Sequence, residues 1–169
     1  SKLGTSVSTF YPVHNTELMP EDPLQAIRSG NAANVDVLIG SNSDETTLWG
    51  HGDVDDAKLQ RIAAEFNVND GINAYRTNRP DANAAELLVA LTSDHMFRIP
   101  GIRLAEAQIE HNPNVWMYLF DWKSRAFDGR LGATHALEIP FAFNNLDRAG
   151  VDVFIGSGPT PQQLASTMH

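Results

Sequence analysis

The sequence predicts an α/β fold, in which a parallel sheet carries flanking helices, and two short apolar runs are the main reason. Residues 35–39 and 115–120 have the length and composition of strands. Both runs are apolar on both faces, so we expect them to be buried on both sides, as in a parallel sheet. Two such strands cannot close a sheet alone. Either further strands escape the pattern, or the segment docks onto a sheet supplied by residues outside these 169, and we favour the second interpretation.

The first helix is predicted over residues 22–30 from its terminal residues. Asp22 is a typical N-terminal cap, Pro23 suits the first turn, and Gln25 stands three residues after the cap. Gly30 then provides a stop. The result is a short helix of about two turns before the first strand.

Three more helices are predicted between the two strands. One is indicated by apolar residues at helical spacing and begins near residues 53–56, where acidic side chains suit the positive end of the helix dipole. Others are expected at about 83–91 and 102–110, the last ending before Asn112 and Pro113. Residues 41–52 are expected to form a loop, and residues 136–143 a mixed segment. The apolar positions of the first of these helices are Leu59, Ile62, Ala63 and Phe66.

Composition and charge exclude several classes of function. The 12 Lys and Arg are scattered among 21 Asp and Glu, giving a net charge of −9, which would repel nucleic acid and anionic membrane surfaces. The apolar runs are too short to span a membrane. The sequence has no cysteine and no Asn-x-Ser/Thr sequon. Although Ser1 is not an initiator methionine, we expect a cytoplasmic protein that acts on a small molecule, with no nucleic-acid partner and no membrane insertion.

Polar residues follow both predicted strands. Residues 40–45 come directly after the first strand and include Asp44 and Glu45, and residues 129–135 follow the second and end at His135. Ligands of open α/β sheets gather beyond the carboxyl ends of the strands, where such loops converge. A carboxylate beside an imidazole can support proton transfer to and from a nucleophile. Taken alone, a Glu in a polar loop or a His near glycines is not specific.

Metal binding is not expected, and no cofactor is predicted. The other five histidines are far apart in the sequence, without an i,i+4 pair or an HExxH motif. Residues 53–56 are rich in Asp, but the later ligands and the glycine of a calcium-binding EF-hand loop are missing, so a helix cap is the better interpretation. The five histidines are His14, His51, His95, His111 and His169.

Four stretches of the chain resemble the type-B carboxylesterase family, which includes bacterial para-nitrobenzyl esterases and the cholinesterases. The likeness extends from about residue 11 to residue 168, and the stretch around His135 is the most specific part. The sequence departs from the family at Thr46, where glycine is usual, and at His14-Asn15-Thr16. The four stretches are 35–45 (VDVLIGSNSDE), 93–100 (SDHMFRIP), 115–122 (VWMYLFDW) and 132–141 (GATHALEIPF).

The resemblance implies the fold, the reaction and two catalytic residues. It makes Glu45 the acid and His135 the base of a Ser-Glu-His triad on an α/β-hydrolase fold, where the serine comes first in the chain. That Glu45 rather than Asp44 faces the imidazole also depends on the resemblance, because spacing cannot decide between them. The substrate class it implies is a small-molecule carboxylic ester.

The nucleophile is missing from these residues. No Gly-x-Ser-x-Gly motif occurs, and the glycine-rich stretch that would supply an oxyanion hole is also absent. Ser157 lies between two glycines, but it follows the histidine and precedes two prolines, so we expect a surface turn. Residues 1–169 are therefore expected to be the C-terminal part of a single domain, partnered by an upstream part of the same protein and inactive alone. The alternative is a non-catalytic, esterase-like binding or adhesion protein that has lost the serine.

A few side chains near the expected site have ordinary explanations. Glu138, three residues after His135, is expected to form a structural ion pair rather than a second catalytic contact. Trp49, Met96 and Phe97 are candidates for lining a substrate site, but aromatic and methionine side chains more often belong to a core.

Overall fold

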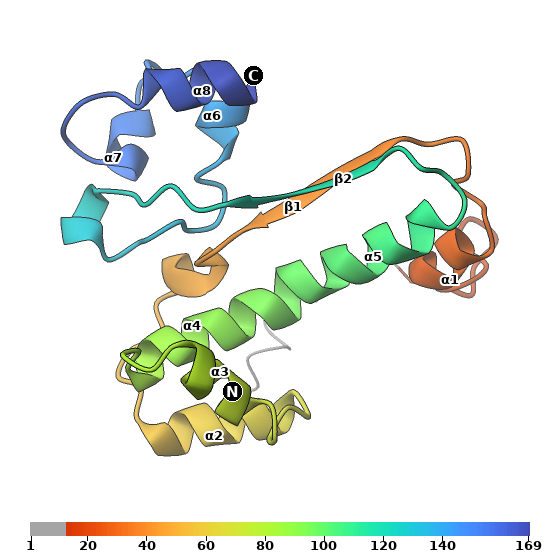
Figure 1. Ribbon diagram of the computed structural model, residues 1–169, viewed down its shortest axis with the longest axis horizontal. Helices are drawn as coiled ribbons and strands as arrows, with labels where there is room; N and C mark the ends of the chain where they lie inside the picture. The colour runs from red at the N-terminus through yellow and green to blue at the C-terminus, as the bar shows by residue number, and fades with distance from the viewer. Residues whose placement is uncertain (1–12) are drawn as a thin grey trace. The chain divides into compact units, whose positions relative to one another are not determined.

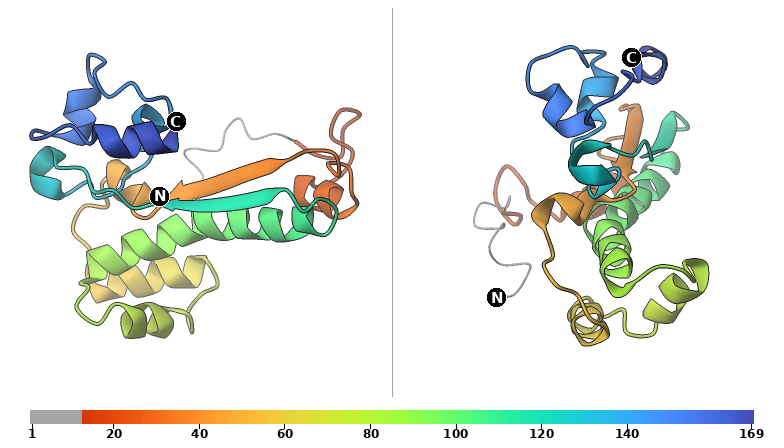
Figure 2. Two further views of the ribbon diagram at one scale, coloured as in Figure 1. Left: turned by 45° about the horizontal axis from the view of Figure 1, so that its top comes forward. Right: turned by 90° about the vertical axis from the view of Figure 1, so that its left-hand side faces the viewer.

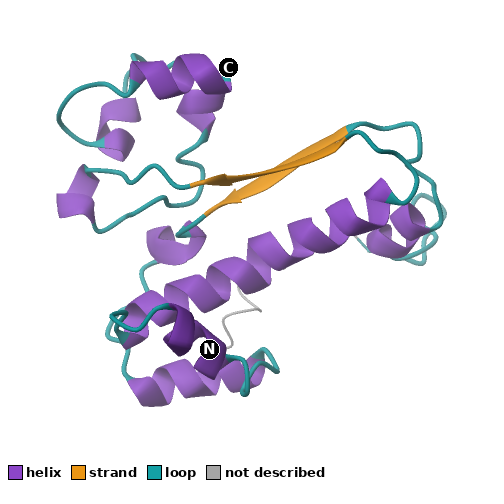
Figure 3. Cartoon of the chain, viewed as in Figure 1, coloured by secondary structure: helices purple, strands orange, loops and turns teal. Residues whose placement is uncertain are grey.

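The computed structural model describes residues 13–169, so Tyr11 and Pro12, where the resemblance begins, lie outside the described residues. Two strands, a series of short helices and connecting loops make up the described chain (Figures 1 and 3). It falls into two compact units. One contains residues 13–38 and 102–116, and the other contains residues 39–101 and 117–169.

The smaller unit contains the first predicted helix. Helix α1 spans Pro23–Arg28, and the Asp22 carboxylate accepts hydrogen bonds from the backbone N–H groups of Leu24 and Gln25. The predicted cap and stop are confirmed, because Gly30 takes the left-handed conformation just after the helix.

The two predicted strands exist and pair with each other. Strands β1 (Val37–Asn42) and β2 (Val115–Phe120) form a two-stranded sheet and run in the same direction (Figure 1). β1 continues three residues beyond the predicted end, because the backbone ladder does not require apolar side chains. Gly40 is needed within it, since a Cβ there would lie 2.5 Å from the ring of Tyr118.

The expectation that both strands are buried on both faces is wrong for this chain. Large apolar side chains of β2 are exposed, and so is Leu38 of β1, at 71%. The reason is that the sheet of the described residues has only two strands, so their outer edges and much of their faces have no covering layer. The exposed residues of β2 are Trp116, Met117, Tyr118 and Leu119.

Three helices between the strands form an apolar core. α2 (Asp56–Glu65) and α4 (Ala84–Ser93) match the predicted positions, whereas α3 (Ile72–Asn78) was not predicted. Asp55 caps α2 by accepting from the N–H of Lys58, as expected for this acidic segment, and Asn83 caps α4 with a full capping box. The buried core residues are Leu59, Ile62, Ala63, Ile72, Leu87, Leu88 and Leu91.

α4 does not stop at residue 91 as predicted. It passes into a π-helical turn, η2 (Asp94–Arg98), and then directly into α5 (Ile99–Ile109), which begins three residues earlier than expected. Pro100 is tolerated because the wider turn before it changes the hydrogen-bond pattern. Tyr75 of α3 donates a hydrogen bond of 2.7 Å to Asp94 at the start of the π turn.

A second apolar cluster follows β2. The segment contains η3 (Ala126–Gly129), α6 (Ile139–Ala142), α7 (Val151–Ile155) and α8 (Gln162–Met168), and Figure 2 shows these short helices close together. Ser157 lies in an exposed bend after α7, as expected. No helix within residues 13–169 is long and apolar enough to cross a membrane. The buried apolar residues are Phe120, Ala133, Leu137, Phe141, Leu146, Ile155 and Ala165.

Candidate active site

Glu45 lies at the start of a short helix directly after β1. This helix, η1 (Glu45–Trp49), occupies part of the segment predicted to be a loop. The carboxylate of Glu45 is nearly buried, with the residue only 5% exposed, and one of its oxygens accepts a hydrogen bond of 2.8 Å from the backbone N–H of Asn42. The buried charge is thus held by the backbone of its own loop.

His135 lies against this carboxylate. Its Nδ1 is 2.7 Å from Oε2 of Glu45, and its backbone N–H donates to the Glu45 carbonyl at 3.2 Å. The imidazole is 43% exposed while the Glu45 side chain is 7% exposed. Among the hydrogen bonds between described residues, none engages Nε2 of His135. The carboxylate therefore fixes the tautomer and the plane of the ring through Nδ1, and Nε2 is not used in this contact.

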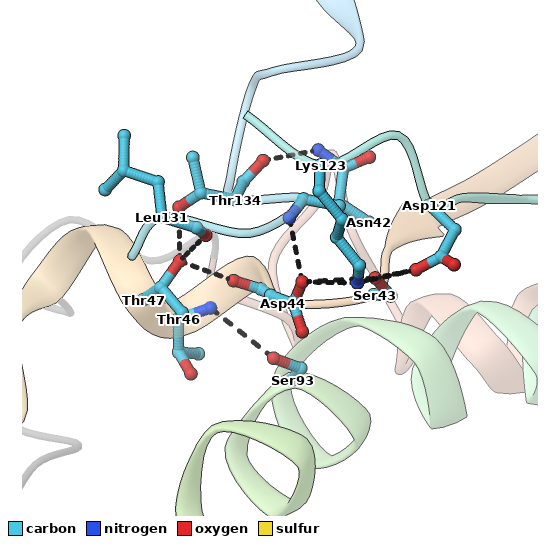
Figure 4. A network of polar contacts seen from close by, with 11 residues as sticks. Asn42, Ser43, Asp44, Thr46, Thr47, Ser93, Asp121, Lys123, Leu131 and Thr134 are labelled. Atoms are coloured by element: carbon cyan, nitrogen blue, oxygen red, sulfur yellow. Dashed lines mark hydrogen bonds and ion pairs between the residues drawn. The ribbon is translucent and has the colours of Figure 1, made fainter. Parts of the chain in front are cut away.

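Hydrogen bonds join the loop that ends at His135 to the loop that carries Glu45 (Figure 4). Thr47 donates its hydroxyl proton toward the carbonyl of Leu131, at 2.6 Å, and also lies 2.8 Å from the hydroxyl of Thr134. The side-chain amide of Asn42 donates to the carbonyl of Thr134 at 2.7 Å. Since Thr134 is fully buried, these contacts satisfy groups that water cannot reach.

Asp44 has a different role from Glu45. Its Oδ2 accepts a hydrogen bond of 2.7 Å from the backbone N–H of Ala133, and its own N–H donates to the Ala133 carbonyl at 3.0 Å. The same oxygen lies 2.7 Å from Nζ of Lys123. Glu45 therefore contacts the imidazole itself, while Asp44 contacts the backbone two residues before it.

Backbone conformation on either side of His135 is restricted. Gly132 has a φ of 58°, and a Cβ there would lie 2.3 Å from Oδ2 of Asp44. Ala136, directly after the histidine, has a φ of 65°, which is unfavourable for a residue with a side chain. The histidine is thus presented between two residues in the left-handed region.

Two aromatic rings lie next to the imidazole and to each other. The ring centroids of Trp49 and Phe97 are 5.3 Å and 5.2 Å from that of His135, and the two rings stack on each other at 5.9 Å. The expectation that these residues belong to a core is wrong for Trp49 and Met96, which are 44% and 39% exposed. Trp49 lies on η1 and Phe97 lies on the π turn. Both are next to the histidine and belong to neither apolar cluster.

Glu138 does not form the expected ion pair among the described residues. Its Oε2 accepts a hydrogen bond of 2.5 Å from the side-chain amide of Asn42. Its partner is an amide rather than a cation, because the polar side chain that reaches it is that of Asn42, which is buried at the end of β1. Asn42 therefore contacts Glu45, Thr134 and Glu138 together, and a lone Asn in a Ser/Asn-rich loop gave no signal of this role.

The remaining histidines lie in separate environments. His51 accepts or donates through Nε2 at 3.2 Å from the hydroxyl of Thr46, and burial, followed by the charge of Lys58, lowers the pKa of His51. His95 stacks on Phe66, with ring centroids 3.9 Å apart. Within residues 13–169, no group of three His, Asp or Glu side chains is placed to hold a metal ion.

The chain belongs to the carboxylesterase family, whose pattern matches residues 2–150. It is 32% identical over 145 residues to the para-nitrobenzyl esterase of Bacillus subtilis (strain 168), covering 82% of this chain and 28% of that protein. It is 30% identical over 154 residues to the phenmedipham hydrolase of Pseudarthrobacter oxydans, covering 88% and 30%. The chain thus spans less than a third of the length of these relatives.

The fold is that of part of an α/β-hydrolase. A crystal structure of the Geobacillus stearothermophilus carboxylesterase superposes with a TM-score of 0.74 at 29% identity, covering 90% of this chain and 33% of that one. The predicted fold class and family are confirmed. The parallel pair β1 and β2, with helices between them, lies within the part of the chain that matches this carboxylesterase.

Proposed function

We propose that the protein carrying this chain hydrolyses carboxylic esters, and that Glu45 and His135 are two members of its Ser-Glu-His triad. The observation that carries the proposal is the 2.7 Å contact between Oε2 of Glu45 and Nδ1 of His135, which leaves Nε2 without a hydrogen bond to the described residues. Family membership supports the reaction class. We further propose that residues 1–169 are the C-terminal part of one α/β-hydrolase domain, whose serine and oxyanion hole are upstream.

In this reaction the serine hydroxyl attacks the ester carbonyl while Nε2 of His135 accepts its proton. The proton then passes to the departing alcohol, leaving an acyl-serine. Water, deprotonated by the same nitrogen, releases the carboxylic acid and restores the serine. The Glu45 carboxylate stabilises the imidazolium in both halves of the cycle, and its burial strengthens that interaction, because a charge in a poorly solvated site is less screened.

The experiment is ester hydrolysis by the full-length protein on para-nitrophenyl butyrate, comparing the wild type with His135→Ala. We expect kcat to fall by about a thousandfold or more, because the general base is lost. His111→Ala is the matched control, since the His111 ring bonds the carbonyl of Arg28 and, among the described residues, makes no hydrogen bond to Glu45. Wild-type activity that His135→Ala leaves intact would contradict the triad. A wild type without activity would favour the esterase-like binding protein.

A further inference from the structure

The carboxylate next to the proposed triad acid has a complete set of partners of its own. Asp44 accepts from the N–H of Ala133 and pairs with Lys123, both through Oδ2 at 2.7 Å. Lys123 also donates to the Ser43 hydroxyl at 2.8 Å and pairs with Asp121 at 2.7 Å. Figure 4 shows Lys123, Ser43 and Asp121 grouped beside Asp44. We call Asp44 and Lys123, with Ser43 and Asp121, the Lys123 clamp.

We propose that Asp44 and Lys123 are positioning residues, which hold the histidine loop in place through the backbone of Ala133. This inference rests on the proposed function and adds to it residues that do not touch the imidazole. Ala133 is two residues before His135 and fully buried. A carboxylate that accepts its N–H and an N–H that donates to its carbonyl hold both polar backbone groups of this residue.

The geometry leaves the loop little freedom to compensate for a lost contact. Gly132 sits so close to Oδ2 of Asp44 that even a Cβ would collide at 2.3 Å, so loop and carboxylate are in direct contact. On the other side, Ala136 is in the left-handed region. A shift of Ala133 would therefore be carried to His135, and displacements of about 1 Å can lower catalysis by roughly 100-fold.

The charge of Lys123 is what gives the clamp its strength. Hydrogen bonds to charged groups are shorter and stronger than neutral ones. Although partial burial acts to lower it, hydrogen bonds to Asp121 and Asp44 raise the pKa of Lys123. Hydrogen bonds from Lys123 and Ser43 lower the pKa of Asp121. The ammonium therefore pairs with two carboxylates, one of which contacts the histidine loop.

If Lys123 served only to stabilise the fold, it would not need to lie against Asp44. Lys123 is 51% exposed and contributes nothing to either apolar cluster. An exposed ion pair of similar geometry exists between Arg76 and Asp56, at 2.7 Å, with no contact to the histidine loop. Such pairs usually contribute little to stability. The position of Lys123 against Asp44, rather than its charge alone, is what the proposal concerns.

The test uses the full-length protein and para-nitrophenyl butyrate, with Lys123→Met, Lys123→Arg and Asp44→Ala, and with Asp56→Asn as the control. The fraction of working active sites is measured by titration with a phosphonate inhibitor, from the burst of leaving group that it releases. The kcat is then calculated for each titrated site. We expect kcat to fall roughly 10-fold in Lys123→Met and roughly 100-fold in Asp44→Ala, with KM unchanged within about twofold. Lys123→Arg should recover most of the loss, and Asp56→Asn should match the wild type.

Amide hydrogen exchange of the peptide that contains residues 129–137 gives a second readout. Exchange there should be faster in Lys123→Met than in the wild type, with no change around Asp56. A loss of titrated sites at constant kcat for each site, or unchanged kcat in Lys123→Met, would overturn the proposal. Activity lost in His135→Ala but unaffected in Lys123→Met would refute the clamp and leave the triad intact, so the two failures are distinguishable.

Discussion

The helical core of α2, α3 and α4 and the loops around Glu45 and His135 are held together in opposite ways. The core is a set of fully buried apolar side chains, such as Leu59 and Leu88, whose contacts depend on volume and have no direction. The loops are joined by hydrogen bonds from Asn42, Asp44 and Thr47 to backbone groups of the facing loop. Damage to the first region should therefore affect stability, and damage to the second should affect catalysis.

The largest expected effect on stability is that of Leu88→Ala. Leu88 is fully buried in the helical core, so the truncation leaves a cavity and should lower the free energy of unfolding by about 2–5 kcal/mol. The kcat for each titrated site should stay within about twofold of the wild type, because the Leu88 side chain packs within the helical core and its truncation removes none of the hydrogen bonds of Glu45 and His135. Urea unfolding and burst titration of the full-length protein give both numbers.

Leu18→Ala is the matched control for that variant, because Leu18 is 97% exposed and its truncation should leave stability unchanged. If Leu88→Ala lowered kcat for each titrated site by much more than about twofold, the two regions would not be independent and the comparison would be wrong.

The same contrast decides what could be predicted from the sequence. Apolar spacing located α2 and α4, because packing of a helix face repeats every three or four residues. α3 was not predicted because only one of its residues, Ile72, is buried, so the segment has no repeating apolar face. η1 was predicted to be part of a loop, because a run of Ser, Asn and Asp is typical of a loop. The strands were found from their apolar runs, but their exposure was not, because it depends on neighbours that the runs do not reveal.

For the candidate site, Glu45 and His135 were singled out, and the structure brings them into contact. Their supporting residues were not. Asn42, Thr47 and Lys123 act through single directional hydrogen bonds between segments about 80 to 90 residues apart, and such contacts leave no periodic pattern in the sequence. Spacing could not choose between Asp44 and Glu45, because adjacent residues differ in direction but not in spacing. The family resemblance selected Glu45, and the structure places Glu45 against the imidazole.

A smaller effect is expected where the two regions meet, at His51. Its ring contacts Thr46 of η1, and Lys58 of α2 donates to its carbonyl. Burial, followed by the charge of Lys58, lowers the pKa of His51 below 6.5, so the unfolded chain takes up this proton first as the pH falls. The wild type should therefore lose stability relative to His51→Gln between pH 7.5 and about 5.5, with no further loss once the pH is below the folded-state pKa.

Thermal unfolding of both proteins at these pH values measures the effect. If the difference in Tm between wild type and variant were constant over this range, or moved in favour of the wild type at low pH, the contact would not be formed with a neutral imidazole.

The central claim is that Glu45, and not another carboxylate of the network, orients His135. The most direct measurement is kcat for full-length Glu45→Gln against Glu138→Gln on para-nitrophenyl butyrate. Both changes keep the side-chain shape, and both carboxylates accept from Asn42, but only Glu45 contacts Nδ1 of His135. We expect Glu45→Gln to lower kcat by roughly 1,000- to 10,000-fold, as loss of a triad acid does, and Glu138→Gln by less than about 10-fold. Equal losses in the two variants, or a larger loss in Glu138→Gln, would contradict the account.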